Sequence, residues 1–267
     1  MPPAPRITSR QHPLVKRCRA LARRRDGAHV LLDGEHLVDQ ALSAGVVVDV
    51  LLAVAGASSV VVDRASRAGT TVYEVSAAVL DAASPVRQPS GILAIAAWTP
   101  MSVANALSRR ATDGPCLAPV SVQDPGNLGS LIRAADALGG AGVLALDDTA
   151  DPGGWKALRG AMGSTFRIPV GRGSSGDAVA EARRLGLVVA ATTARARDAV
   201  DPSELPANSL VLLGNEGAGL PDDLVARTEV RVSVPMRPGV ESLNVAVTAA
   251  LILDAVRRAG VRETGPT

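Results

Sequence analysis

The chain has 267 residues, a length that suits one large domain or two small ones, and its 47% share of hydrophobic residues is enough to build buried cores. Two distant cysteines, Cys18 and Cys116, exclude a disulfide framework, and three histidines without metal-ligand spacing argue against zinc, so we expect no metal and a cytoplasmic protein. We also expect no membrane association, because polar residues, Gly or Pro interrupt every apolar run before the roughly 18 residues that a span needs, and because the basic start lacks the apolar core of a signal peptide.

The formal net charge of +2 hides a basic N-terminal segment. Residues 1–25 contain seven Arg and one Lys but no acid, whereas the rest of the chain has 20 basic and 26 acidic residues. This asymmetry predicts a polyanionic partner such as RNA, with Arg10, Lys16 and Arg17 as candidate contacts, although a solvated Arg-rich helix face would give the same composition. Aromatic residues number only four, so RNA contacts would go mainly from Arg to phosphate and sugar.

In the first part of the chain, short β-branched runs alternate with helical stretches, which indicates an α/β fold. The pattern predicts helices at 12–24, 35–44, 58–68 and 77–82 and strands at 29–32, 46–54, 70–75 and 92–97. These elements suffice for a compact domain over residues 1–97. The periodicity weakens over residues 98–115, where Pro100 and the run Thr112-Asp113-Gly114-Pro115 predict a linker.

The alternation restarts in a second domain, expected over residues 116–267. It predicts strands at 117–122, 142–146, 167–170, 187–192, 210–213 and 230–234, helices beginning near residues 126, 154, 176 and 220, and a last helix over 242–258. Ligands of open α/β sheets bind at the carboxyl ends of strands, so the loops that follow strands 117–122, 210–213 and 230–234 form the expected site.

These three loops are rich in Gly, Pro and small polar residues. In the first, Asn127 and its glycines open a helix that carries Arg133, an arrangement that could clamp an anion but that also fits a plain Asn N-cap and a surface Arg. In the second, three glycines around Glu216 would let the backbone approach a ligand closely. In the third, Ser242 is expected to cap the last helix, with Asn244 in its first turn.

Together the loops resemble the three motifs of the SpoU (TrmH-type) branch of the SPOUT RNA methyltransferases, over about residues 117–262. The family patterns are Asn-x-Gly-x-x-x-Arg, Gly-x-Glu-Gly and Pro-Met-x5-Ser-Leu-Asn-Val. All fixed positions match, at Asn127, Gly129, Arg133, Gly214, Glu216, Gly217, Pro235, Met236, Ser242, Leu243, Asn244 and Val245. One departure is Pro238 followed by Gly239, where the family often has Gly at the first of these two positions. The segment from Ile7 to Leu93 is similar to the ribosomal-protein-like α/β RNA-binding domain that precedes the catalytic domain in ribosomal RNA methyltransferases.

The resemblance implies an enzyme that transfers a methyl group from S-adenosylmethionine to a ribose 2′-hydroxyl, with 23S ribosomal RNA as the expected substrate. It also implies a homodimer and a Rossmann-like parallel sheet with a C-terminal trefoil knot. The implied catalytic residues are Arg133, Asn127, Glu216, Ser242 and Asn244. Because a guanidinium is effectively never deprotonated, Arg133 is expected to position the ribose and to stabilise the alkoxide.

The implied cofactor site uses mainly backbone groups, at Thr192, Leu213, Gly214, Asn215, Glu216, Gly217, Val234, Pro235, Met236, Leu243 and Asn244. Arg133 is also expected to contact RNA. Lys156 and Arg159 precede a predicted strand of the catalytic domain and are further candidate phosphate contacts, with a solvated surface as the alternative.

Three other functions remain open on the sequence. A transfer RNA substrate is the nearest, but a separate front domain favours ribosomal RNA. A non-catalytic RNA-binding factor with the same fold is a second, and the intact motif residues argue against it. A nicotinamide-dependent dehydrogenase is the third, and the glycine spacing of the second loop differs from the dinucleotide fingerprint.

Overall fold

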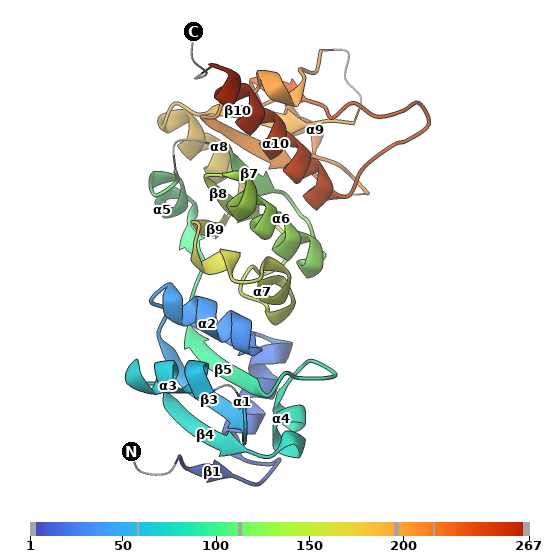
Figure 1. Ribbon diagram of the computed structural model, residues 1–267. Coiled ribbons are helices and arrows are strands. Elements are labelled where there is room, and N and C mark those ends of the chain that lie inside the picture. The colour runs from blue at the N-terminus through green and yellow to red at the C-terminus, as the bar shows by residue number, and fades with distance from the viewer. Residues whose placement is uncertain (1–3, 58, 112–113, 195–197, 216, 264–267) are drawn as a thin grey trace. The chain divides into compact units, whose positions relative to one another are not determined.

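The computed structural model describes residues 4–57, 59–111, 114–194, 198–215 and 217–263 (Figure 1). The chain forms two compact units, the first from residues 1–99 and 153–166 and the second from residues 100–152 and 167–267. In the described ranges, no helix is both long enough and apolar enough to cross a membrane.

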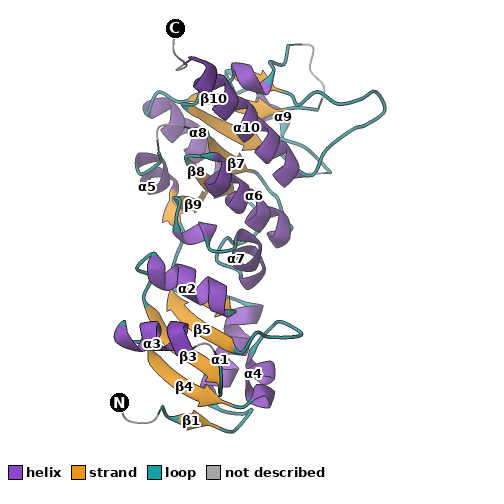
Figure 2. Ribbon diagram, viewed as in Figure 1, coloured by secondary structure: helices purple, strands orange, loops and turns teal. Residues whose placement is uncertain are grey.

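The first unit is a mixed sheet with helices on both faces (Figure 2). Its described strands follow the order β1 (Arg6–Ile7), β4 (Thr71–Val75), β3 (Val48–Val54), β5 (Ile92–Ala97) and β2 (His29–Asp33). The strands β1, β4 and β3 run parallel, and β5 is antiparallel to β3 and to β2. The helices are α1 (Pro13–Arg23), α2 (Glu35–Ser43), α3 (Ser59–Arg67) and α4 (Ala77–Ala83).

Two apolar cores lie on the two faces of this sheet, because successive strand residues point to opposite sides. Leu51 packs with α2 and α3 on one face, and its neighbour Leu52 packs with α1 and α4 on the other. Cys18 of α1 lies in the second core, where burial raises the pKa of its thiol to about 12.

A segment from the second half of the sequence completes the first of these cores. Helix α7 (Trp155–Ala161) contacts β2, and its residue Leu158 is fully buried among the residues of the first unit. Phe166 meets Trp98 edge to face, with ring centroids 6.3 Å apart. The expected domain boundary assigns this segment to residues 116–267, whereas the structure groups it with the first unit.

The second unit is a parallel sheet with helices packed against it. Its described strands follow the order β12 (Val230–Val232), β10 (Val188–Thr192), β11 (Ser209–Leu213), β7 (Cys116–Pro119), β8 (Gly142–Leu146), β9 (Val170–Gly173) and β6 (Met101–Ser102). Every neighbouring pair is parallel. Strands β8 and β11 are buried at every residue, which explains why they read as continuous apolar runs in the sequence.

The helices of the second unit are α5 (Val103–Ser108), α6 (Pro125–Leu138), α8 (Ser175–Arg184), α9 (Asp222–Val225) and α10 (Val245–Glu263). Helices α5, α8 and α9 bury apolar residues against one face of the sheet, and α6 and α10 pack against each other. The predicted α/β class with a parallel sheet is therefore confirmed.

Most predicted elements are present, with three differences. The strand expected at 167–170 begins only at Val170, directly after Pro169, which has no N–H to donate to a neighbouring strand. The expected linker contains β6 and α5, both of which belong to the second unit. The last helix begins at Val245 and not at Ser242.

The burial of Leu158 gives a test of this division. Leu158→Ala should destabilise the first unit by about 2–5 kcal/mol, because it leaves a cavity in that unit's core. Hydrogen exchange should then show lower protection in β2, with β11 unchanged. Leu212→Ala, a fully buried site in the second unit, is the matched control and should lower protection in β11. Lower protection of β11 alone in the Leu158 variant would contradict the assignment.

Candidate active site at the carboxyl ends of the central strands

The expected site lies where the strand order of the second sheet changes direction. Strand β7 is central, with β8 on one side and β11 on the other, so the loops after β7 and β11 are neighbours. The side chain of Asn215 joins them, because its Nδ2 donates to the backbone oxygen of Ser121 over 2.8 Å and its Oδ1 accepts from Gly217 N over 2.8 Å. Ser121 has a φ of 54°, a left-handed conformation that is uncommon outside glycine.

The glycine loop after β11 closes on itself. The N–H of Gly219 donates to the oxygen of Asn215 over 2.9 Å, and Gly219 has a φ of 68°. A Cβ placed on Gly214 would lie 2.5 Å from the carbonyl carbon of Gly219. Glycine at position 214 is therefore a requirement of the backbone geometry. Glu216, the predicted carboxylate of this loop, lies outside the described residues.

The start of α6 differs from the expected Asn N-cap. Asp124 caps the helix by accepting from the N–H of Asn127 over 2.7 Å, and Pro125 occupies the first helical position. The side chain of Asn127 instead accepts a hydrogen bond from Nδ2 of Asn244 over 2.9 Å. This bond joins the first motif loop to the third.

Asn244, and not the predicted Ser242, caps α10. Its Oδ1 accepts from the N–H of Ala246 over 2.9 Å, and its backbone oxygen accepts the first i to i+4 bond, from Thr248 N. The prediction that Ser242 caps the helix was wrong. Ser and Asn are about equally good N-cap residues, so the sequence of this loop could not show which of the two caps the helix.

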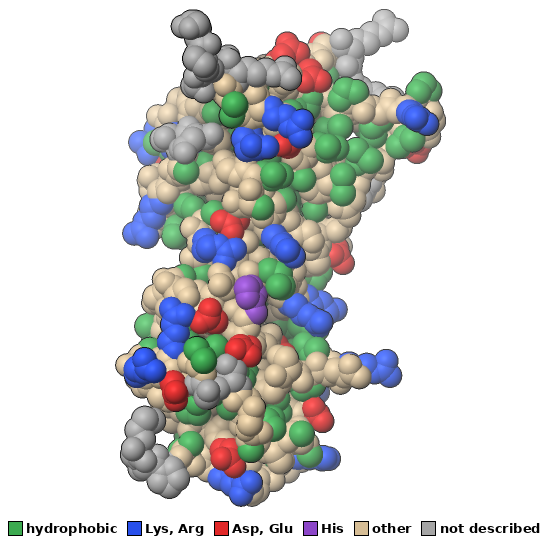
Figure 3. Space-filling view, viewed as in Figure 1, with side chains coloured by type: hydrophobic (Ala, Val, Ile, Leu, Met, Phe, Trp, Pro, Cys, Tyr) green, Lys and Arg blue, Asp and Glu red, His purple; other side chains and the backbone are tan. Residues whose placement is uncertain are grey.

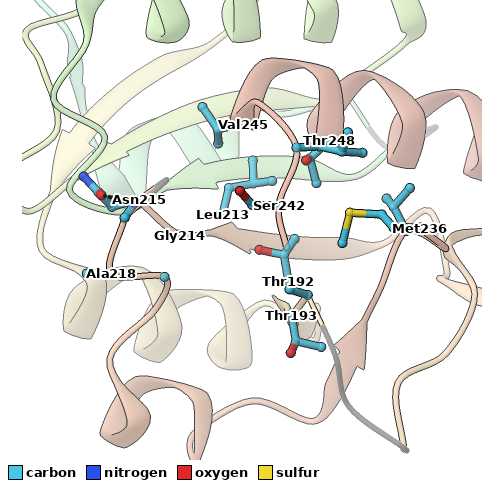
Figure 4. Close-up of a pocket in the computed structure, with 15 residues that line it drawn as sticks. Thr192, Thr193, Leu213, Gly214, Asn215, Ala218, Met236, Ser242, Val245 and Thr248 are labelled. Carbon is cyan, nitrogen blue, oxygen red and sulfur yellow. Dashed lines mark hydrogen bonds between the residues drawn. The ribbon is translucent and has the colours of Figure 1, made fainter. Parts of the chain in front are cut away.

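A cavity of about 260 Å³ lies between the glycine loop after β11, the loops after β10 and β12, and the first turn of α10 (Figure 4). Side chains of Thr192, Leu213, Met236 and Ser242 come to it from different segments of the chain. The predicted residues that line it are Thr192, Leu213, Gly214, Asn215, Gly217, Val234, Met236, Ser242 and Leu243. No ionisable side chain occurs among the described residues of its wall.

Six lining residues were not among the predicted site residues, namely Thr193, Ala194, Ala218, Gly219, Val245 and Thr248. Thr248 lies one helical turn after Asn244, so the helix period could have pointed to it. Pro235 lines a neighbouring hollow of about 360 Å³ that shares Val234 and Met236 with the first cavity.

Arg133 is exposed on α6 and is not one of the residues of the cavity wall. Its side chain makes no hydrogen bond or ion pair with the described residues, so its guanidinium is available to a ligand. Cys116 is fully buried, and burial raises the pKa of its thiol to about 12, which excludes it as a nucleophile near neutral pH. In the described part of the chain, no cluster of His, Cys, Asp and Glu is placed to hold a metal ion.

The predicted RNA contacts differ in their surroundings. Arg10 and Lys16 are exposed and Arg17 is half-buried. Other cations of the same basic segment bind within the protein: Arg6 pairs with Glu74 at 3.2 Å, Arg19 donates to the oxygen of Ala82, and Arg25 donates to the oxygen of Trp98. Lys156 and Arg159 are exposed on α7 of the first unit. On the face shown in Figure 3, cationic and acidic side chains are interspersed.

Two family models match this chain, in separate parts of the sequence. The model of the SpoU rRNA Methylase family matches residues 115–254, and that of an MRM3-like substrate binding domain matches residues 12–94. The 23S rRNA (guanosine(2553)-2′-O)-methyltransferase RlmP of Bacillus subtilis is 34% identical over 230 residues, which cover 85% of this chain and 88% of that protein.

Two solved structures with bound AdoMet are also similar. An rRNA methyltransferase from Sinorhizobium meliloti has a TM-score of 0.85 and 29% identity, covering 96% of this chain and 98% of that one. The SpoU methyltransferase AviRb from Streptomyces viridochromogenes has a TM-score of 0.81 and 26% identity, covering 94% of this chain and 100% of that one.

The two roles of the Asn244 side chain can be separated by substitution. Asn244→Ala removes both the cap and the bond to Asn127 and should destabilise α10 by about 1 kcal/mol. Asn244→Asp keeps an oxygen for the helix amides and places a negative charge at the helix start, so it should keep most of that stability. Hydrogen exchange of the α10 amides measures both effects, and equal losses in the two variants would show that Asn244 does not act as a cap.

Proposed function

This chain belongs to the SpoU rRNA methylase family, and from that membership we propose that it transfers a methyl group from S-adenosylmethionine to a ribose 2′-hydroxyl of 23S ribosomal RNA. The observation that carries the proposal is a cavity lined by the second and third motif loops at the carboxyl ends of the parallel strands, with the first motif loop joined to the third by the hydrogen bond between Asn244 and Asn127. The relatives named as 23S rRNA 2′-O-methyltransferases support the substrate, and the substrate-binding domain match supports ribosomal over transfer RNA.

The described residues of the cavity suit the proposed cofactor. The glycine loop presents backbone that carries no side chain at Gly214 or Gly217, and the wall adds small hydroxyls from Thr192 and Ser242 and an apolar contact from Met236. The described part of the wall is uncharged, so it can surround a sulfonium without placing a competing cation beside it. When bound, S-adenosylmethionine supplies an electrophilic methyl group.

The remaining chemistry belongs to the protein. A ribose hydroxyl is a weak nucleophile, so the enzyme must hold its oxygen in line with the methyl carbon and stabilise charge on that oxygen as its proton leaves. Arg133 is the proposed group for this role, and a guanidinium can donate hydrogen bonds to the oxygen but cannot take its proton. Asn127 and Asn244, joined by their side chains, would orient the ribose and the cofactor, together with Ser242 and Glu216.

We also propose that the protein is a cytoplasmic homodimer with a trefoil knot near its C-terminus. One face of α10 packs on α6, and the opposite face exposes Val247 and Leu251, which are 48% and 44% exposed and one helical turn apart. Val240 in the preceding loop is 41% exposed. These side chains support a subunit contact formed by α10 and that loop.

Sedimentation analysis tests the dimer. Val247→Asp combined with Leu251→Asp should convert the dimer to a monomer, because a carboxylate in an apolar contact is costly to bury. Val60→Asp is the matched control, since Val60 is 71% exposed on a helix of the first unit, and it should leave the dimer intact. If the double variant sediments as the wild type does, α10 is not part of the subunit contact.

Methyl transfer and cofactor binding should be lost in different variants. Arg133→Ala should abolish 2′-O-methylation of 23S ribosomal RNA while cofactor binding, measured by calorimetry, stays close to the wild type. Gly214→Ala should abolish both, because its Cβ would open the glycine loop. Mapping of 2′-O-methyl marks in cells that carry the wild type, either variant or no gene provides the readout. A full set of marks in cells without the gene would refute the proposed function, and loss of cofactor binding in Arg133→Ala would refute the role of that residue.

A further inference from the structure

The first unit contains a cationic hollow whose walls come from two segments that are distant in the sequence. One wall is the loop after α4, with Val86, Arg87 and Gln88, and the other is Arg159 of α7. The hollow has a volume of about 460 Å³. Both arginines are exposed, and both belong to the first unit, although Arg159 follows β8 of the second unit in the sequence.

Both walls are anchored to the body of the first unit. The hydroxyl of Ser84 accepts from the N–H of Val86 over 2.9 Å and donates to the carboxylate of Asp33, which fixes the start of the loop. Helix α7 is held by the buried Leu158, and the oxygen of Met162 lies 3.2 Å from Nε2 of His36. The two arginines therefore extend from a defined framework.

The charge of this hollow is not balanced by hydrogen-bonded partners. Arg64 of the same unit is paired with Asp39 at 2.6 Å, and Arg6 is paired with Glu74. In contrast, the side chains of Arg87 and Arg159 form neither an ion pair nor a hydrogen bond with any residue that the structure describes. The carboxyl of Asp33 interacts electrostatically with Arg159, but burial raises the pKa of Asp33, and its carboxylate accepts a hydrogen bond from the hydroxyl of Ser84 and not from Arg159. Two guanidiniums around one hollow repel each other until an anion lies between them.

We propose that this hollow binds a backbone phosphate of the RNA substrate, so that α7 completes the RNA-binding surface of the first unit. The inference rests on the proposed function for the identity of the polyanion. Guanidinium groups match phosphate oxygens with paired hydrogen bonds, and Gln88 adds an amide donor. Lys156 lies one turn before Arg159 on α7 and extends the cationic face toward the next phosphate.

Binding of transcribed 23S ribosomal RNA to the full chain at several salt concentrations tests the proposal. Arg87→Ala and Arg159→Ala should each weaken binding about tenfold, and removing both should lower the slope of log K against log salt by about 1, the contribution of one phosphate. The double variant should be weakened much less than a hundredfold, because both side chains contact the same phosphate. Arg67→Ala, which removes an exposed arginine from α3 of the same unit, is the control and should bind as the wild type.

Arg159→Ala could also disturb Asp33, so Arg87→Glu is the second variant, with hydrogen exchange of β2 as a check of folding. It should weaken binding more than Arg87→Ala because it reverses the charge. If both Arg87 variants bind RNA with the wild-type affinity and salt slope, the hollow does not bind a phosphate of the RNA, and the proposed methyltransferase function is unaffected. If these variants bind RNA more weakly but the wild type transfers no methyl group to ribosomal RNA, phosphate binding by the hollow is supported and the proposed function is refuted.

Discussion

The backbones of Gly214 and Gly219 lie so close that a Cβ on Gly214 would sit 2.5 Å from a carbonyl carbon, and this contact folds the loop after β11 back on itself. The closed loop fixes the backbone of Asn215, whose side chain then reaches Ser121 at the end of β7. A second amide, that of Asn244, links the loop before α10 to Asn127. One glycine contact and two amide hydrogen bonds thus join three segments that the sequence separates widely.

These connections are of modest strength, and that suits a site that must admit a ligand. A hydrogen bond between neutral groups contributes only about 0.5–1.5 kcal/mol net, less when it is exposed to water. The amide of Asn244 is exposed, and the same side chain caps α10. A ligand that displaces the bond to Asn127 would therefore leave the helix cap in place, so that the loop can adjust without unwinding α10.

The sequence predicts best what depends on local pattern and least what depends on contacts between distant residues. Buried strands such as β8 and β11 are continuous apolar runs, and the glycine loop was found because close backbone approach requires glycine. The helix start at Asn244 was misplaced because two good capping residues occur in one loop. The sequence could not predict that α7 packs in the first unit, because the residues that contact Leu158 lie in another part of the chain. For the same reason, the motif identified Arg133 but could not predict that this residue lies outside the cavity wall.

Arg25 shows how part of the basic N-terminal segment serves the architecture of the first unit. Its guanidinium donates to the oxygen of Trp98 over 2.8 Å, and a Cβ on Gly153 would lie 2.4 Å from its Nη1. It therefore binds the backbone at Trp98, just before the chain leaves the first unit after residue 99, and lies close to Gly153, where the chain returns to that unit. The segment 147–154 links the end of β8 in the second unit to α7 in the first. Binding of RNA at the proposed Arg159 site would hold the substrate on the same chain as the catalytic sheet and so would raise the effective concentration of ribose there.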